Sequence, residues 1–353
     1  MGVKMGKTLP IPRTIEWVNG RVKLINQLKL PRKLEYIETD NYLRIAEAIR
    51  KMEIRGAPAI GVAAAFALAL AATKSNAKNR GELLRELEGA ANAIKRTRPT
   101  AKNLFWAVER TLRRAYDAKG GVEEVKKAVV EEALRIARED EQANRRIGDY
   151  GEQFIEDGDV ILTICNAGSL ATYYYGTALA PIYRAWEKGK RVSVIALETR
   201  PYLQGARLTA FELKKAGIPV RVATDNSMGF IISRGMADKV FVGADRITLT
   251  GHVVNKIGTY TLAVVAKRHG VPFYVCAPTS TIDPDTPIEK VEIEQRPAEE
   301  VIYIDGIRIT PEGVDAIYYA FDITPPELVT AIITEKGVVG PPFDRTIARV
   351  ISG

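Results

Sequence analysis

Two side chains in this sequence, Cys165 and Asp245, lie where reactive groups are often found. Cys165 ends the apolar run 159–165 (DVILTIC), and a helix is expected to begin near Ser169. Because the N-terminus of a helix favours a thiolate, Cys165 suits a reactive role, although a lone cysteine is often a small buried apolar side chain. Asp245 follows another apolar run and suits a partly buried general acid, with a turn or helix cap as the alternative.

The remaining cysteine and the two histidines favour structural roles. Cys276 lies inside an apolar run and is expected in the core. His269 stands at a helix end, where it suits the helix dipole, and His252 is expected in an exposed loop. Because these side chains are well separated in the sequence, we expect no metal site. Two cysteines also exclude a disulfide framework and favour an intracellular compartment.

Three short segments could bind a phosphate or a sugar. Arg55 precedes Gly56, Ala57 and Pro58 at the start of an apolar helix, where free N–H groups and a guanidinium would hold an anion. Arg98-Pro99-Thr100 precedes another helix in the same way, and both segments could equally be plain helix starts with surface arginines. Asn255-Lys256 offers donors to a phosphate or to sugar hydroxyls.

The elements that would position these residues alternate between strand and helix after residue 158. Short apolar runs predict strands at 159–165, 191–197, 219–223, 239–243 and 272–277, and helical patterns lie between them at 169–188, 204–216, 227–236 and 255–269. This alternation predicts a parallel sheet with helices on both faces. Ligands bind such sheets at the carboxyl ends of the strands, where polar groups lie in this sequence: Cys165-Asn166, Glu198-Thr199-Arg200, Thr224-Asp225-Asn226, Asp245-Arg246 and Pro278-Thr279-Ser280.

The first 150 residues have a different character. Asn19-Gly20 predicts a β-hairpin, and helices are expected at 81–96, 103–117 and 122–154. We therefore predict an α/β protein with an N-terminal β-hairpin plus helical domain (1–150) and a Rossmann-like α/β catalytic domain (151–353). The first strand of the second domain lacks the G-x-G-x-x-G pattern, and the chain lacks a P-loop, which argues against NAD and P-loop chemistry.

Composition favours a soluble cytoplasmic protein. The net charge is +8, but Lys and Arg are mixed with Glu along the chain, which is typical of a charged surface rather than of a nucleic-acid site. The N-terminal segment has no apolar core of a secretory signal. Residues 56–73 carry no charge, yet they are mostly alanine, so a buried core helix is expected rather than a membrane span.

Several segments together resemble the 5-methylthioribose-1-phosphate isomerase family from about residue 14 to 345. They are RGAPAIG (55–61), RPTAKNLFWA (98–107), CNAGSLAT (165–172), ETRPYLQGARLTAFEL (198–213), TDNSMG (224–229), GADRI (243–247), NKIGTY (255–260), PTSTID (278–283) and VEIEQR (291–296). Tyr173-Tyr174-Tyr175 and Lys102 depart from the family pattern, which affects loop detail and not the reaction.

The resemblance implies an aldose–ketose isomerase of methionine salvage, usually a homodimer, with a sugar phosphate as substrate and no metal or organic cofactor. By motif, Cys165 and Asp245 match the catalytic positions. The matching substrate-binding positions are Arg55, Gly56, Ala57, Arg98, Gln204, Asn255 and Lys256. Asp245 would protonate the ring oxygen, and Cys165 would be the base at C2 or a transition-state stabiliser.

Two relatives with this fold remain as alternatives. Ribose-1,5-bisphosphate isomerase uses a similar Cys/Asp pair but needs a second phosphate site in place of a methylthio pocket. The regulatory subunits of the eukaryotic translation-initiation guanine-nucleotide exchange factor bind without catalysis and do not need the pair. Fold alone does not separate the three, whereas the site residues favour the first.

Overall fold

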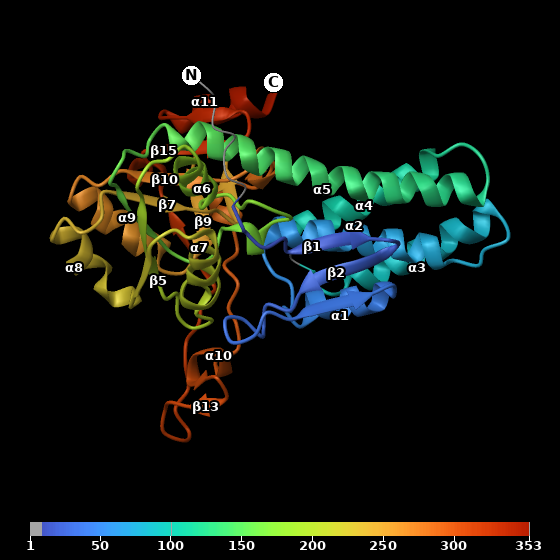
Figure 1. Ribbon diagram of the computed structural model, residues 1–353, viewed down its shortest axis with the longest axis horizontal. Helices are drawn as coiled ribbons and strands as arrows, with labels where there is room; N and C mark the ends of the chain where they lie inside the picture. The colour runs from blue at the N-terminus through green and yellow to red at the C-terminus, as the bar shows by residue number, and fades with distance from the viewer. Residues whose placement is uncertain (1–8, 100, 353) are drawn as a thin grey trace. The chain divides into compact units, whose positions relative to one another are not determined.

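The computed structural model describes residues 9–99 and 101–352 and divides into two compact units (Figure 1). The helical unit comprises residues 12–143 together with the short segment 168–176. The sheet unit comprises the described residues 9–11, 144–167 and 177–352. The domain boundary after residue 150 stays a prediction.

The helical unit begins with a small antiparallel sheet of order β1-β2-β3. Its strands are β1 (Ile15–Val18), β2 (Arg21–Ile25) and β3 (Tyr36–Thr39). Asn19 and Gly20 join the first two strands with φ of 51° and 74°. A tight turn with both central residues in the left-handed region matches the twist of the flanking strands, so the predicted hairpin is confirmed.

The rest of the helical unit consists of helices packed around α2. These helices are α1 (Tyr42–Arg50), α2 (Ala57–Lys74), α3 (Arg80–Lys95), α4 (Lys102–Asp117) and α5 (Val122–Glu152), whose residues from 144 onward belong to the sheet unit. At Gly61 of α2, an added Cβ would lie 3.1 Å from the carbonyl oxygen of Asn103, so α2 and α4 approach closely. Phe66 of α2 is fully buried, with its ring centroid 5.7 Å from that of Trp17.

The uncharged segment 56–73 forms this central helix. Among the described residues, α2 is the one helix long and apolar enough to cross a membrane, but 72% of it is buried inside the protein. Its small side chains permit close packing on every side, as expected for a core helix.

The sheet unit is built on a seven-stranded sheet within the described residues, of order β16-β15-β10-β7-β4-β5-β6. The strands are β4 (Val160–Thr163), β5 (Ser193–Leu197), β6 (Val220–Ala223), β7 (Lys239–Val242), β10 (Phe273–Cys276), β15 (Ala331–Thr334) and β16 (Gly337–Val339). Neighbours pair in parallel except β15 and β16. All five predicted strands are present, and the predicted α/β fold with a Rossmann-like sheet is confirmed.

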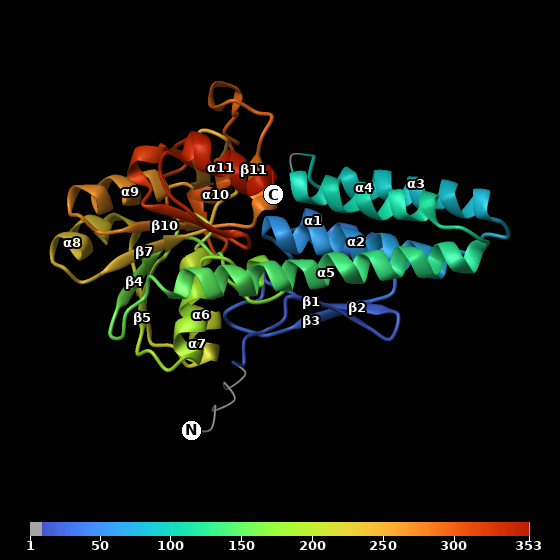
Figure 2. The same cartoon turned by 90° about the horizontal axis from the view of Figure 1, so that it is seen from above.

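Helices cover both faces of this sheet. Figure 2 shows α6 (Ala180–Glu187) and α7 (Ala210–Ala216) on one face, and α8 (Met228–Ser233) and α9 (Thr259–Arg268) on the other. Counted along the chain, the six parallel strands lie in the order 3-2-1-4-5-6, with β4 first and β7 fourth. The chain reverses its direction of winding between β4 and β7, and open α/β sheets bind ligands at such a switch point.

Smaller elements complete the sheet unit. A second sheet has the order β11-β8-β9-β14, from β8 (Arg246–Thr248), β9 (Val253–Lys256), β11 (Ile282–Asp283) and β14 (Phe321–Thr324). The helix α10 (Glu299–Ile302) and the hairpin β12 (Tyr303–Ile304) and β13 (Ile307–Arg308) extend away from the main sheet (Figure 1). The C-terminal helix is α11 (Phe343–Ser352).

Two helix predictions were wrong at their starts. The segment 169–188 holds a three-residue 3₁₀ turn (Ser169–Ala171), and its helix begins only at Ala180. Tyr175 and Gly176 both have φ of 76°, a left-handed conformation that no helix contains. The helix predicted from 255 begins at Thr259, because Val253–Lys256 forms a strand paired with β14.

Candidate active site

Cys165 lies in a sharp bend just beyond β4. Its φ is 65°, which is uncommon and unfavourable for a residue with a Cβ. Two hydrogen bonds hold this conformation. The Cys165 N–H donates to Thr199 Oγ1 at 2.8 Å, and the Cys165 carbonyl accepts from Thr209 Oγ1 at 2.7 Å. The bend is therefore fixed by side chains that follow β5.

The expectation that Cys165 precedes a helix N-terminus was wrong, because α6 begins fifteen residues later, at Ala180. Its surroundings are instead set by the bend, in which the residue is half-buried.

Asp245 lies beyond β7, the strand next to β4. The two strands pair Ile161 with Lys239 and Leu162 with Val240. At Gly243, an added Cβ would lie 2.7 Å from the Cβ of Ala167, so the loops after the two strands are in close contact. The motifs CNAG and GADR therefore lie side by side at the switch point of the sheet.

The backbone of Asp245 is held by a hydrogen bond, although the residue is exposed. Its N–H donates to the Val254 carbonyl of β9 at 2.9 Å. The predicted partial burial of Asp245 was wrong, since the residue is exposed. Exposure increases along the segment, from the buried Gly243 through the partly buried Ala244 to Asp245.

Gln204, Asn255 and Lys256 are buried in the same unit. Gln204 is 6% exposed, and within the described residues its Oε1 has no hydrogen-bond partner. Asn255 donates from Nδ2 to Thr259 Oγ1 at 3.0 Å. A buried amide oxygen without a partner is costly, and a ligand donor would satisfy it.

Lys256 lies among aromatic side chains. Its Nζ is 3.4 Å from the Tyr318 hydroxyl and 4.9 Å from the centroid of the Phe321 ring. Both aromatic rings attract the buried ammonium through cation–π interactions. Burial first, and then the charge of Glu300, raise the pKa of Tyr318 to about 12.

Asp322 stands opposite Asn255 in the pairing of β14 with β9. Its Oδ2 accepts from the backbone N–H groups of Gly258, at 2.7 Å, and Tyr260, at 3.1 Å, and so caps the start of α9. Burial raises the pKa of Asp322 to about 6, although these two hydrogen bonds and the charge of Lys256 oppose the shift. Asp322 therefore fixes the chain immediately after Asn255-Lys256.

Arg55, Gly56 and Ala57 lie in the helical unit, where Ala57 is the first residue of α2. Gly56 is the N-cap with φ of 93°, and an added Cβ would lie 2.3 Å from the Ala171 carbonyl oxygen. Only glycine fits this contact and this backbone conformation. The predicted helix start is thus confirmed, and the first N–H groups of α2 have no side-chain cap.

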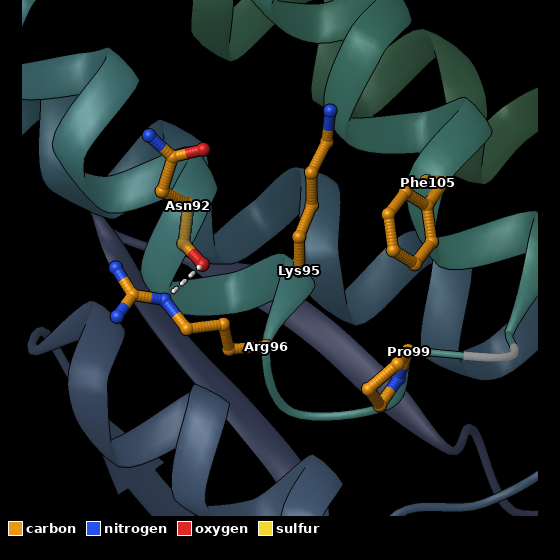
Figure 3. Close-up of a pocket in the computed structure, with 5 residues that line it drawn as sticks. All are labelled: Asn92, Lys95, Arg96, Pro99 and Phe105. Atoms are coloured by element: carbon orange, nitrogen blue, oxygen red, sulfur yellow. Dashed lines mark hydrogen bonds between the residues drawn. The ribbon is translucent and has the colours of Figure 1, made fainter.

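Arg98 lies between α3 and α4 and is half-buried, while Thr100 lies outside the described residues. Beside this segment is an open pocket of about 350 Å³ lined by Asn92, Lys95, Arg96, Pro99 and Phe105 (Figure 3). The Arg96 side chain donates from Nε to the Asn92 carbonyl at 3.3 Å. None of the nine predicted site residues lines this pocket, so it does not mark the predicted site.

The nine predicted residues therefore form two groups, one in each unit. Cys165, Gln204, Asp245 and the pair Asn255-Lys256 belong to the sheet unit. The other group is Arg55, Gly56, Ala57 and Arg98.

The sequence reasoning missed several residues that surround Cys165 and Lys256. These are Thr209, Glu212, Tyr318 and Asp322. Thr209 and Glu212 lie within the segment 198–213, which was quoted for the family resemblance, but the sequence indicated no role for either residue. Tyr318 and Asp322 lie in a region where no strand was predicted, and their place depends on β14 pairing with a distant strand.

Comparison with known proteins gives a consistent result over nearly the whole chain. Residues 53–341 match the model of the Initiation factor 2 subunit family. A methylthioribose-1-phosphate isomerase from Thermotoga neapolitana is 51% identical over 340 residues, 96% of this chain and 98% of the relative.

Two solved structures are similar throughout. The 5-methylthioribose 1-phosphate isomerase from Pyrococcus horikoshii has a TM-score of 0.93 and 44% identity, covering 97% of this chain and 96% of that one. The translation initiation factor eIF-2B delta subunit from A. fulgidus has a TM-score of 0.90 and 49% identity, covering 97% and 99%.

Proposed function

Because the chain belongs to the Initiation factor 2 subunit family, and to the methylthioribose-1-phosphate isomerases within it, we propose that Cys165 and Asp245 carry out its reaction. The enzyme converts 5-methylthioribose 1-phosphate to 5-methylthioribulose 1-phosphate, an aldose–ketose isomerisation in methionine salvage. The observation that supports these two residues is their place at the carboxyl ends of neighbouring strands, on the two sides of the switch point.

The chemistry needs an acid and a group that acts at C2. The phosphate on the C1 oxygen prevents ordinary opening to a free aldehyde, so the ring oxygen must gain a proton as its bond to C1 breaks. The hydrogen at C2 then moves to C1, and the C2 hydroxyl loses its proton as the ketone forms. The exposed carboxyl of Asp245 is the proton donor to the ring oxygen, and Cys165 acts at C2.

The remaining predicted residues are assigned to substrate binding. Arg55, Gly56, Ala57 and Arg98 are assigned by their sequence motifs alone. In the sheet unit, the unpartnered Oε1 of Gln204 accepts from a sugar hydroxyl. Asn255 and Lys256 supply donors.

A panel of two substrates tests the function. Purified protein without added metal or nucleotide is mixed with 5-methylthioribose 1-phosphate or with ribose 1,5-bisphosphate, and the ketose is followed by NMR. We expect conversion of the first only. Turnover of ribose 1,5-bisphosphate instead would assign the chain to nucleotide salvage.

A second candidate function is a non-catalytic regulatory subunit, as the name of the A. fulgidus relative suggests. Such a subunit has no need of a reactive cysteine beside a carboxyl group. The loops that carry Cys165 and Asp245 are in close contact at Gly243, which favours the enzyme. A folded protein that leaves both substrates unchanged would support the regulatory subunit.

We also propose that the enzyme is a cytoplasmic homodimer. The segment 303–319 carries several exposed large apolar side chains, with Ile307 68% and Ile317 79% exposed. Exposed apolar side chains are typical of protein interfaces when they lie together, and a second copy of the chain is the partner we assign. Light scattering after gel filtration is expected to give twice the mass of the chain, 38.9 kDa. The assignment is supported if the double variant Ile307→Glu, Ile317→Glu has the mass of a monomer while the control Leu43→Glu has the mass of a dimer. It is contradicted if neither variant changes the mass.

A further inference from the structure

A buried carboxylate lies beneath the bend that carries Cys165. Glu212 belongs to α7 and is 0% exposed. Its Oε2 accepts from the Tyr183 hydroxyl at 2.9 Å, and its Oε1 accepts from Asn166 Nδ2. Because burying a carboxylate costs several kcal/mol unless donors satisfy it, its presence here calls for a specific role.

The hydrogen bonds of Glu212 lead directly to Cys165. Asn166, the next residue after Cys165, uses one amide hydrogen for Glu212 and the other for Thr209 Oγ1, at 3.2 Å. Thr209 Oγ1 in turn donates its own hydrogen to the Cys165 carbonyl at 2.7 Å. Since Thr209 Oγ1 and Glu212 Oε1 both accept from Asn166 Nδ2, these two bonds set the orientation of the Asn166 amide.

The helix that carries Thr209 is widened at this point. Residues Gly205–Thr209 form one turn of π-helix directly before α7. Widened turns of this kind are frequent at functional sites, where they redirect a side chain. Here the turn is followed by Glu212, three residues after Thr209, and both side chains contact the segment 165–166.

We propose that Glu212 is a positioning residue for the isomerisation, which through Asn166 and Thr209 holds the backbone of Cys165 in its left-handed conformation. The thiol then points where the substrate requires it. This inference rests on the proposed function, because it assumes that Cys165 acts on the substrate. A displacement of about 1 Å at such a group can lower a rate about 100-fold.

The test uses the variants Glu212→Gln, Thr209→Val and Thr209→Ser. Glutamine fits without a clash, since Oε1 can still accept from Asn166 while Nε2 donates to the Tyr183 hydroxyl. The bond from Asn166 to a neutral amide oxygen is weaker than the bond to a carboxylate, so this variant loosens Asn166 without removing its contact. Valine removes the donor to the Cys165 carbonyl, and serine restores it. We expect kcat to fall about 10- to 100-fold in Thr209→Val and at least about 5-fold in Glu212→Gln, with KM within about 3-fold. Thr209→Ser should recover to within about 3-fold of the parent.

A second readout does not depend on turnover. The chain has two cysteines, and Cys276 is fully buried with its pKa raised by burial, so alkylation by iodoacetamide reports on Cys165. We expect the alkylation rate to change at least about 3-fold in Thr209→Val and to return in Thr209→Ser.

Unchanged kcat and alkylation in Thr209→Val and Glu212→Gln would overturn the proposal, as would a Thr209→Ser variant no better than Thr209→Val. If the parent protein fails to convert the sugar phosphate while alkylation still follows this pattern, the proposed function fails and the positioning of Cys165 stands.

Discussion

The substitution Gly205→Ala tests how closely the structure specifies the surroundings of Cys165. A Cβ at residue 205 would lie 1.7 Å from the Leu197 carbonyl oxygen and 3.0 Å from Thr199 Oγ1. Leu197 is the last residue of β5, and Thr199 Oγ1 is the acceptor for the Cys165 N–H. An added methyl group must therefore push apart the π-helical turn and the end of β5.

The size of the effect follows from this distance. Reaching an ordinary carbon–oxygen contact of about 3.2 Å requires a separation of about 1.5 Å between two backbone segments. Overpacking a core costs about 1–3 kcal/mol, and a backbone clash belongs at the upper end, so we expect a loss of about 3 kcal/mol. At about 2–4 °C per kcal/mol, Tm should fall by roughly 6–12 °C. Because Thr199 moves with the strand end, kcat should fall at least about 10-fold.

The assay combines thermal unfolding with turnover, and Gly229→Ala is the matched control. A Cβ at Gly229 meets nothing within 4 Å, and the residue lies in α8, where alanine favours the helix by up to about 1 kcal/mol. The control should keep its activity and melt at the same or a slightly higher temperature. A Gly205→Ala protein with parental Tm and kcat, or an equal loss in both variants, would show that the contact at residue 205 does not control the position of Thr199.

Three further predictions concern other parts of the chain. Gly56→Ala should destabilise the protein by about 3 kcal/mol or more in urea, because its Cβ would lie 2.3 Å from the Ala171 carbonyl oxygen at a φ of 93°; a midpoint equal to that of the parent would contradict this. Phe66→Ala should cost about 3–5 kcal/mol, since this ring is fully buried against Trp17, and a loss below about 1 kcal/mol would show that the core of the helical unit is loosely packed. Burial raises the pKa of Asp322 from 3.8 to about 6, so its contribution to stability is fully present below about pH 4 and is lost as the pH rises through 6. The stability lost between pH 4 and pH 7 should therefore be smaller in Asp322→Asn by about 2 kcal/mol, and an identical pH dependence of the urea midpoints would speak against the shift.

The central strands could be predicted because their signal is local. Runs such as VIL (160–162) and VIAL (194–197) are apolar at every position, as strands covered on both faces require, and all of the predicted runs became neighbours in the main sheet. The strands of the second sheet have weaker patterns. From the sequence, a helix was predicted to begin at residue 255, within Val253–Lys256. The segment is a strand because it pairs with Phe321–Thr324, more than sixty residues away in the chain.

The segment after Cys165 shows where local propensity fails. Residues 169–188 have good helix formers, yet the chain turns through left-handed Tyr175 and Gly176 before α6 begins. Ser169 is 0% exposed and Tyr175 is 2% exposed, so tertiary packing decides this segment. A helix beginning near Ser169 was also the reason for expecting a reactive thiolate at Cys165. Since α6 begins only at Ala180, that reason does not hold.

The candidate site could be predicted by position but not by environment. Cys165 and Asp245 each follow a predicted parallel strand, which places both residues at the same edge of the sheet. The parallel pairing of β4 with β7 agrees with this prediction. The exposure of Asp245 and the buried contacts of Glu212 depend on side chains from distant segments. No spacing in the sequence encodes such contacts.

The most direct test of the account is the turnover of 5-methylthioribose 1-phosphate by the parent protein, Cys165→Ser and Asp245→Asn, with the ketose product followed by NMR. All three proteins should show the same cooperative unfolding, because Asp245 is exposed and serine closely matches the size of cysteine. The account predicts conversion by the parent and a loss of at least about 100-fold in each variant. Parental turnover in either folded variant would contradict the assignment of Cys165 and Asp245 as the catalytic pair.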